Sequence, residues 1–329
     1  MTSGSTALPV LGRLPGFEGA VGWLNSDPLD PADLRGKVVL VDFWTYTCIN
    51  WLRTRGYVRA WAARYADHGL VVIGVHTPEF PFEGDVDNVR REVADMRVTY
   101  PVAIDSDYGV WRAFTNHYWP AVYIADAQGR IRHTHFGEGG YEECERVIQQ
   151  LLRDAGNAGI TDELVSVAGE GFEAQADWPN VQSPETYLGY EQGQNFASAD
   201  DSAFGTPRLH RLPDRLGLNQ WALSGSWTIQ RGSSRLDDGE GSIAFRFHAR
   251  DVNVVLSPAQ PEASIPFQVR LDGDVPGNAH GLDIDAEGRG TVREPRLYQL
   301  IRRTGSITDS TFEITFQSPG VEGWVFTFG

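Results

Sequence analysis

The feature that most constrains the fold of this chain is an apolar segment that runs directly into a short polar loop and a cysteine. Residues 37–43 read KVVLVDF, and an almost unbroken apolar run of this length is typical of a strand buried on both faces of a sheet. The loop at residues 44–47 leads to Cys48. Residues 49–67 follow with a helical pattern that ends at His68-Gly69. The sequence therefore predicts a buried strand and a helix, with Cys48 at the junction.

The same alternation of strand and helix continues through the first half of the chain. Further strands are predicted at residues 70–75, 100–105, 121–125 and 131–136, and helices at residues 85–96, 108–114 and 141–154. Residues 127–129 are typical of a hairpin turn between the last two strands. Such alternation indicates a layered α/β domain, which we assign to residues 1–154.

The second half of the chain has a different pattern. Residues 155–184 are rich in Gly, Ala, Asp and Glu and are predicted to be a linker. Beyond them, short alternating runs predict strands at residues 221–229, 242–247, 252–256, 267–271, 312–316 and 324–328. Turns are predicted at residues 237–239, 272–273 and 287–288. Many short strands with frequent turns favour an all-β sandwich or jelly roll over residues 185–329.

Charge and composition exclude several function classes. The formal net charge is −16, which argues against a nucleic acid or an anionic membrane as the main partner. No apolar run reaches 18 residues, and residues 1–22 lack the basic and apolar regions of a secretory signal. We therefore expect a cytoplasmic protein if Met1 is the native start, and otherwise a soluble domain excised from a membrane-anchored protein. Two cysteines are too few for a closed cysteine-based zinc site, and we expect neither a metal nor another cofactor.

The position of Cys48 favours a reactive thiol. A cysteine that follows a buried strand and opens a helix lies among free backbone N–H groups at the positive end of the helix dipole. These groups stabilise a thiolate, so the pKa of the thiol falls and its reactivity rises. The alternative is that Cys48 is only a small buried apolar residue. The strand-to-helix junction favours the nucleophile.

Several motifs around Cys48 resemble those of thioredoxins. VDFW places Asp42 six residues before Cys48, and HYWPAV carries Pro120 just before the predicted hairpin. The extra strand and helix, together with GVHTPEF at residues 74–80, resemble the TlpA/DsbD branch of this family. The motifs WTYTCIN, NHYWPA and HFGEG in the first half, and PETYLGY, FHARDV, AHG and EPRLYQLIR in the second, are similar to the soluble C-terminal part of DipZ-type thiol:disulfide interchange proteins.

The resemblance implies a fold and a set of roles. The fold would be an α/β thioredoxin fold with an inserted strand and helix, followed by a β-sandwich like a carbohydrate-binding module. Cys48 would act in thiol–disulfide exchange, and Pro120 would be a cis-proline that faces it and shapes the substrate groove. Asp42 would be a buried carboxylate beneath Cys48. It would either move protons during exchange or serve a structural hydrogen bond, and both interpretations stay open.

We also expect six residues to line the substrate site: Thr45, Tyr46, Trp51, Trp119, His76 and Glu79. The three aromatic side chains would form its wall, although core packing explains them nearly as well. The histidine and the glutamate follow the second strand, whose end lies at the same edge of the sheet. The threonine stands three residues before Cys48, the spacing by which peroxiredoxins orient a peroxide.

The sequence departs from the thioredoxin pattern at the second cysteine. The motif is Cys48-Ile49-Asn50-Trp51, so Trp51 stands where the resolving cysteine of a CxxC motif would be. Cys48 can therefore attack a disulfide or a peroxide, but completion of the cycle needs an outside thiol. Cys144 lies among glutamates on the last predicted helix, where neighbouring carboxylates raise the pKa of a thiol. We do not expect it to pair directly with Cys48.

Three functions remain open on this basis. The first is a thiol–disulfide oxidoreductase that acts through Cys48 on a low-molecular-weight thiol or a disulfide-bearing protein. The second is a one-cysteine peroxidase, in which an external thiol reduces the sulfenic acid. The third is a non-catalytic binding scaffold. For the β-domain, the candidate ligands are a carbohydrate or a protein. Five aromatic residues would either offer flat surfaces to sugar rings or fill the core between two sheets: Tyr190, Trp221, Trp227, Tyr298 and Trp324.

Overall fold

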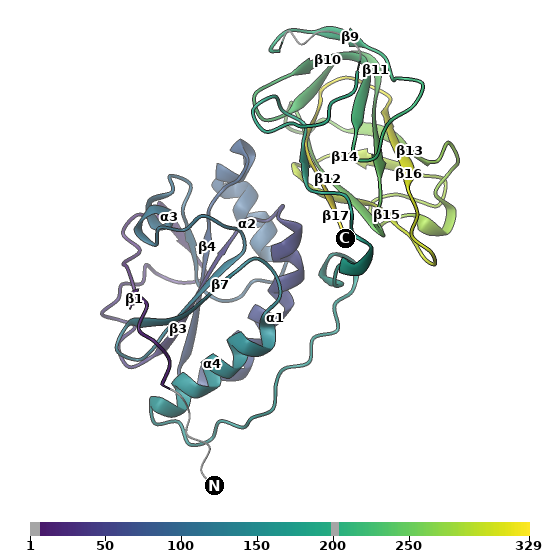
Figure 1. The fold of residues 1–329 in the computed structure, drawn as a ribbon. Helices are drawn as coiled ribbons and strands as arrows, with labels where there is room; N and C mark the ends of the chain where they lie inside the picture. Colours follow the sequence, from purple (N-terminus) through teal and green to yellow (C-terminus); the bar gives the residue numbers. More distant parts are fainter. Residues whose placement is uncertain (1–6, 199–203) are drawn as a thin grey trace. The chain divides into compact units, whose positions relative to one another are not determined.

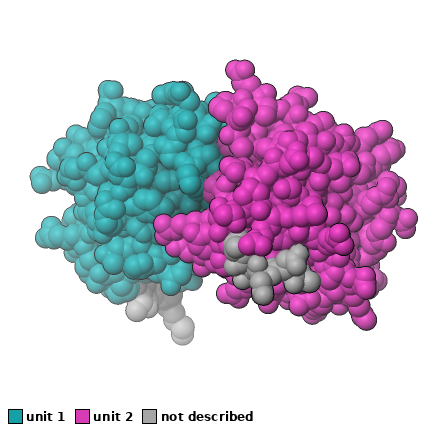
Figure 2. All heavy atoms as spheres, turned by 90° about the horizontal axis from the view of Figure 1, so that it is seen from above, with its two compact units in different colours: residues 1–174 teal, residues 175–329 magenta. Residues whose placement is uncertain are grey.

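The computed structural model describes residues 7–198 and 204–329, and it divides into two compact units (Figures 1 and 2). The units are residues 1–174 and 175–329, so the division falls inside the segment predicted to be a linker. Met1, on which the cytoplasmic prediction depends, lies outside the described residues. Within the described ranges, no helix combines the length and apolar character that a bilayer crossing requires.

The first unit is a mixed sheet flanked by helices (Figure 1). Its strands are β1 (Gly12–Arg13), β2 (Gly22–Leu24), β3 (Val38–Trp44), β4 (Leu70–His76), β5 (Val102–Ile104), β6 (Ala121–Ala125) and β7 (Arg130–Phe136). Its helices are α1 (Ile49–Tyr65), α2 (Val86–Asp95), α3 (Gly109–Ala113) and α4 (Tyr141–Asp154). Short 3-10 turns are η1 (Ala66–His68), η2 (Pro81–Gly84) and η3 (Gly171–Glu173). The predicted thioredoxin fold is confirmed, with β5 and α3 as the inserted strand and helix.

The strand order of this sheet is β1-β7-β6-β3-β4-β5-β2. The central strand β3 pairs in parallel with β4 and antiparallel with β6, and all seven of its residues are buried. Because side chains alternate between the two faces of a strand, Val41 and Phe43 join the core cluster that includes α3. Asp42 and Trp44 lie on the other face, where both contact Trp51 of α1. The Cys48 loop therefore lies at the edge of the sheet where both β3 and β4 end.

The second unit is all-β. Its strands are β8 (Thr186–Tyr187), β9 (Arg208–His210), β10 (Trp221–Ile229), β11 (Ser234–Phe247), β12 (Asp251–Pro258), β13 (Ile265–Leu271), β14 (Arg289–Val292), β15 (Arg296–Arg302), β16 (Ser310–Phe316) and β17 (Val321–Phe328). They form one antiparallel sheet, ordered β14-β13-β16-β11-β17-β12-β15, with β10 added to β11, β9 to β10 and β8 to β17. The long β11 pairs with β16 near one end and with β17 near the other, so the sheet curls around a core rich in phenylalanine.

One predicted turn of the second unit is wrong. Residues 237–239 lie inside β11, which is longer than the predicted strand at residues 242–247. The pairing of β10 with β11 shifts register between Ser224 and Trp227, and Gly225 and Gly239 both have positive φ. An irregular pairing of this kind absorbs glycine conformations without ending the strand. The turns predicted at residues 272–273 and 287–288 do lie between strands.

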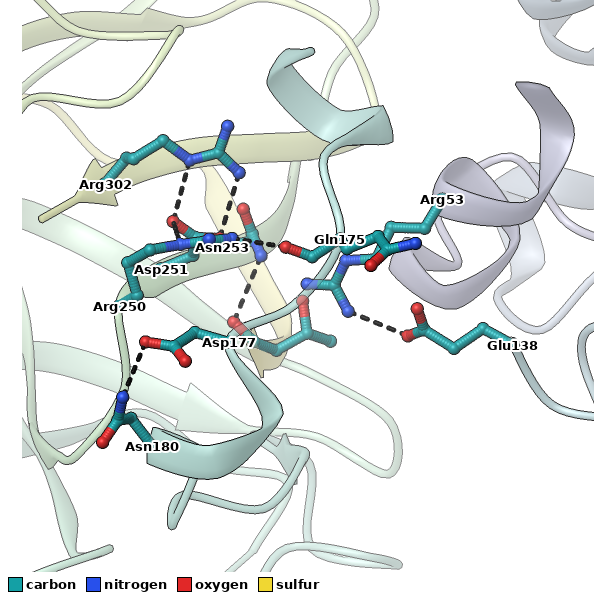
Figure 3. A network of polar contacts seen from close by, with 10 residues as sticks. Arg53, Glu138, Gln175, Asp177, Asn180, Arg250, Asp251, Asn253 and Arg302 are labelled. Carbon is teal, nitrogen blue, oxygen red and sulfur yellow. Dashed lines mark hydrogen bonds and ion pairs between the residues drawn. The ribbon is translucent and has the colours of Figure 1, made fainter. Parts of the chain in front are cut away.

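A buried ion cluster lies at the start of β12. Asp251 is fully buried, and it accepts hydrogen bonds from the guanidinium groups of Arg250 and Arg302 at 2.7 to 3.3 Å (Figure 3). Arg250 also donates to the carbonyl of Gln175 at 2.7 Å, and the Asp251 N–H donates to the carbonyl of Gly329 at 2.8 Å. Two guanidinium groups compensate the cost of burying this carboxylate. The Arg250 side chain and the Asp251 N–H bind the two ends of the unit to the start of β12.

Candidate active site

Cys48 is the N-cap residue of α1. Its N–H donates to the carbonyl of Thr45 at 3.3 Å, and its own carbonyl accepts the N–H of Leu52 at 2.9 Å. The side chain is partly exposed, and Sγ lies 3.8 Å from the carbonyl oxygen of Trp119. The first turn of α1 holds no acidic residue. The sulfur therefore lies at the positive end of a 17-residue helix, in contact with the loop that precedes β6.

The loop opposite Cys48 contains a cis-proline. The Trp119–Pro120 peptide bond is cis, the form expected from the sequence, and Pro120 is buried. The carbonyl of Pro120 accepts the N–H of Gly137 at 2.8 Å. The Trp119 indole donates to the carbonyl of Thr77 at 3.1 Å and packs against Trp111 with ring centroids 4.3 Å apart. The structure therefore brings together Cys48, Trp119 and Pro120.

Asp42 and Trp51 form a buried pair beneath this site. Asp42 is fully buried, and its Oδ2 accepts a hydrogen bond from the Trp51 indole at 2.9 Å. Burial raises the pKa of Asp42 to about 7, and the hydrogen bond from Trp51 opposes that rise. Trp51 is itself fully buried and stacks on Trp44 with ring centroids 4.1 Å apart. The prediction that Trp51 walls the substrate site is wrong, because its side chain points into the core as the hydrogen-bond donor to Asp42.

Three other residues that were predicted to line the substrate site also lie below the surface. His76 is fully buried between Tyr46 and Trp44, with ring centroids 5.6 and 4.8 Å away. Burial lowers the pKa of His76 to about 3, so the ring is neutral at physiological pH. Tyr46 is 1% exposed, and Thr45 is fully buried. These three residues pack under the Cys48 loop and do not line an open cleft, whereas Glu79 is partly exposed.

Glu83 belongs to this site and was missed in the sequence. It is fully buried, and its Oε1 accepts the N–H and the hydroxyl of Thr47 at 3.2 and 2.7 Å. Its Oε2 accepts the N–H groups of Glu79 and Phe80 at 2.7 and 2.9 Å. Burial raises the pKa of Glu83. A glutamate as the third residue of a turn that begins with Pro81 can accept the N–H of the residue before the turn, which is one half of a capping box, and this signal could have found it.

A buried ion pair joins α1 to the loop after β7. Arg53 lies five residues after Cys48, and its Nη1 is 2.9 Å from Oε1 of Glu138 (Figure 3). Both side chains are nearly inaccessible, at 2% and 9% exposure. Burial raises the pKa of Glu138, and the charge of Arg53 opposes that rise. Since the neighbouring Gly137 bonds to Pro120, this pair helps to hold the helix and the cis-proline loop together.

The second cysteine lies apart from these contacts. Cys144 on α4 is 2% exposed, and its Sγ is 3.6 Å from Nε2 of His133. Burial, followed by the nearby charge of Glu143, raises the pKa of Cys144 to about 12. Across the described residues, no disulfide links Cys144 to Cys48. Cys144 is thus a protonated thiol in the core.

Metal ligation and aromatic platforms can be assessed in the same way. In the part of the chain that the structure describes, no group of three or more His, Cys, Asp and Glu side chains is arranged to hold a metal ion. Four of the five aromatic candidates in the second unit are buried: Trp221, Trp227, Tyr298 and Trp324. Tyr190 is 45% exposed and lies beside the exposed ring of Phe204, with centroids 5.0 Å apart. Only this candidate presents a face to solvent.

Comparisons with known proteins agree with this architecture. Residues 13–134 match the AhpC/TSA family, and residues 183–329 match the family described as a thioredoxin-like C-terminal domain. The chain is 37% identical over 258 residues to protein DipZ of Mycobacterium bovis and of Mycobacterium tuberculosis, an alignment that covers 78% of this chain and 36% of each relative. The chain therefore spans about a third of the length of these relatives.

Two shorter proteins match the first unit. Thiol-disulfide oxidoreductase YkuV of Bacillus subtilis is 28% identical over 141 residues, which cover 43% of this chain and 95% of YkuV. The solution structure of a thioredoxin-like protein in its oxidized form is 29% identical, with a TM-score of 0.41, and covers 44% of this chain and 96% of that protein. By these matches, the first unit is similar to thioredoxin-like proteins and to the AhpC/TSA family, and residues 183–329 are similar to the thioredoxin-like C-terminal domain family.

Proposed function

We propose that this protein is a thiol–disulfide oxidoreductase in which Cys48 is the only nucleophile and an external thiol completes the cycle. One observation carries the proposal: Cys48 is the partly exposed N-cap of α1, with its Sγ 3.8 Å from the carbonyl oxygen of Trp119, the residue before cis-Pro120. The helix N-terminus stabilises the thiolate, which is the attacking form. Its relatives named thiol-disulfide oxidoreductase support the same reaction class.

The proposed reaction has two exchange steps. The Cys48 thiolate attacks one sulfur of a disulfide R–S–S–R′, the S–S bond breaks, and R′–S⁻ leaves and takes up a proton. The products are a mixed disulfide between Cys48 and R–S, and the thiol R′–SH. The thiolate of an external thiol then attacks this mixed disulfide at R–S, forms a new disulfide with it and releases Cys48 as a thiolate. Overall, R′–S is reduced to a thiol, the external thiol is oxidised into a disulfide with R–S, and the number of disulfide bonds is unchanged.

An external thiol is required because neither internal position offers one. Trp51 occupies the second position of the motif, and its indole is committed to Asp42. Cys144 is buried against His133, and its raised pKa keeps the thiol protonated. With no resolving thiol to deprotonate, Asp42 serves here as a buried hydrogen-bond acceptor. The proposed partner is a low-molecular-weight thiol or a disulfide-bearing protein.

A one-cysteine peroxidase is the second candidate. It is favoured by the match of residues 13–134 to the AhpC/TSA family and by the spacing of Thr45 and Cys48. The burial of Thr45 opposes it, because a fully buried hydroxyl is poorly placed to orient a peroxide at the partly exposed sulfur. We therefore rank disulfide exchange first and keep the peroxidase as an outcome of the same experiment.

The test uses a Cys144→Ala variant, in which Cys48 is the only thiol. We would measure the pH dependence of its alkylation by iodoacetamide, and then its rates with glutathione disulfide and with hydrogen peroxide. We expect an alkylation midpoint well below about pH 8.5, the value of an ordinary thiol, and faster reaction with the disulfide. The Cys48→Ser, Cys144→Ala double variant is the control. Faster reaction with peroxide would replace the proposal by the peroxidase, and slow reaction with both would leave a binding scaffold.

A further inference from the structure

Three loops meet at the edge of the first sheet, and their contacts converge on Cys48. The loop after β3 carries Thr47 and Cys48, the loop after β4 runs from Thr77 to Glu83, and the loop before β6 carries Trp119. The second loop touches both others. Its Thr77 carbonyl accepts the Trp119 indole at 3.1 Å, and its Glu83 carboxylate accepts two hydrogen bonds from Thr47.

The chemistry of these contacts requires a carboxylate. The two oxygens of Glu83 accept four hydrogen bonds, all from N–H or O–H donors, and the side chain is fully buried. Oε1 serves the Cys48 loop through Thr47, and Oε2 serves its own loop through Glu79 and Phe80. An amide in this place would have one acceptor oxygen, and its NH₂ group would face donors on one side. A neutral amide could therefore accept the hydrogen bonds of only one of the two loops.

We propose that Glu83 is a positioning residue that holds the sulfur of Cys48 against the Trp119 carbonyl by fixing the backbone of Thr47. This inference rests on the proposed function, because it concerns the reactivity of the same thiol. Thr47 is covalently joined to Cys48, so a shift of its N–H shifts the helix N-cap. The loop after β4, which carries Glu83, also holds the loop before β6 in place through the hydrogen bond between Thr77 and Trp119. Glu83 thereby sets the distance between nucleophile and substrate groove without touching the reacting atoms.

A charge effect and a positioning effect predict different results. A negative charge near a thiolate raises the pH at which the thiol ionises. If Glu83 acted through charge alone, Glu83→Gln would move the alkylation midpoint to lower pH and leave the rate at high pH unchanged. If it acts by positioning, the rate at high pH falls, because every thiol is already ionised there and only its placement differs.

The experiment measures the reaction of Cys48 with glutathione disulfide across pH, in the Cys144→Ala background. We expect Glu83→Gln to lower the plateau rate constant at high pH by about tenfold or more, since small displacements of reacting atoms cost this much. Thr47→Val removes one of the four hydrogen bonds and keeps the charge of Glu83. We expect it to lower the same plateau by about threefold, which corresponds to one modest hydrogen bond. It carries the test if Glu83→Gln does not fold.

The matched control is Glu145→Gln. Glu145 is likewise buried and accepts hydrogen bonds from Trp61, Tyr65 and Val165, but Trp61 lies 13 residues beyond Cys48 on α1, about 20 Å along the helix. We expect this variant to lose stability and to keep the wild-type plateau. A plateau within about twofold of wild type in Glu83→Gln, or an equal loss in Glu145→Gln, would overturn the inference. A Cys144→Ala parent that does not react would instead refute the proposed function.

Discussion

The buried carboxylates of Asp42 and Glu83 in the first unit and of Asp251 in the second are stabilised in opposite ways. In the first unit, the carboxylates of Asp42 and Glu83 are held by neutral donors: an indole, a hydroxyl and backbone N–H groups. In the second unit, Asp251 is held by the guanidinium groups of two arginines. Burial accordingly raises the pKa of Asp42 and of Glu83.

This difference indicates where function lies. Carboxylates with perturbed pKa values that lack a balancing charge are costly, and they concentrate at functional sites. Asp42 and Glu83 lie under the Cys48 loop, and a third such carboxylate, Asp105, accepts a hydrogen bond from Thr77 at the start of the loop after β4. The second unit uses its buried carboxylate to join strands and buries its aromatic residues in one core. We therefore regard the first unit as the reactive one, and the following predictions test that contrast.

The largest expected effect is at Cys48. Cys48→Ser should abolish formation of a mixed disulfide with glutathione, because a serine hydroxyl does not exchange with disulfides. Mass spectrometry of the intact protein after incubation with glutathione disulfide measures this as a mass gain in Cys144→Ala and none in Cys48→Ser. Persistent modification of Cys48→Ser would mean that the buried Cys144 reacts, and the contrast between the two cysteines would fail.

The next effect concerns Trp51. Trp51→Ala should lower the free energy of unfolding of the first unit by about 5 kcal/mol, because a large buried ring is lost and Asp42 loses its donor. Trp51→Cys makes a similar cavity but creates a CxxC motif with Cys48. We expect only the latter to form an internal disulfide and to complete disulfide exchange without an external thiol. If both variants depend on the external thiol equally, Trp51 is not what prevents dithiol chemistry.

How far the sequence predicted this site depends on the range of the interactions. The bounds of β6 and α4 agree with the residues expected, because their hydrophobic periodicity is local. Cys48 and Pro120 could be placed near each other from the sequence, because the motifs around them identify the thioredoxin fold, in which both lie at the same edge of the sheet. Core packing was one of the two interpretations of Trp51, and the sequence did not decide between them. The burial of His76 was not predicted, because periodicity shows that a residue faces an apolar layer but not whether a neighbouring loop covers it. Glu83 was missed because its four donors come from two loops that only tertiary packing unites.

A third prediction concerns the pH dependence of stability. The pKa of Asp42 is about 7 in the folded state and 3.8 when unperturbed, so the folded state binds the extra proton between these values. The stability that this group contributes is therefore greatest below pH 3.8 and falls as pH rises to about 7, by about 4 kcal/mol in all. Asp42→Asn keeps an acceptor for Trp51 and does not titrate.

The measurement is urea unfolding of wild type and Asp42→Asn at about pH 4, 5.5, 7 and 8, values that bracket the titration. Other titrating groups are common to both proteins, so the difference between their free energies of unfolding isolates the carboxyl group at this position. We expect this difference to move in favour of the asparagine variant by several kcal/mol as pH rises through this range, and to level off above the folded-state pKa. If the difference in free energy of unfolding does not change with pH, Asp42 is already charged at the lowest pH measured, as a carboxylate with a balancing cation would be.

The smallest expected effect is at Asp251, the buried carboxylate of the second unit that corresponds to Asp42 in the first. Asp251→Ala leaves Arg250 and Arg302 without their carboxylate, and breaking a buried ion pair in this way costs about 3 kcal/mol, the low end of the usual range because both guanidinium groups are a quarter exposed. We expect the second unit to unfold at a lower urea concentration, which tryptophan fluorescence would monitor. We expect no change in the rate at which Cys48 reacts with glutathione disulfide. Replacement by asparagine should cost less than replacement by alanine, since an amide oxygen can still accept from one arginine. A slower Cys48 reaction in either variant would mean that the second unit contributes to the chemistry, and the division of roles drawn here would have to be abandoned.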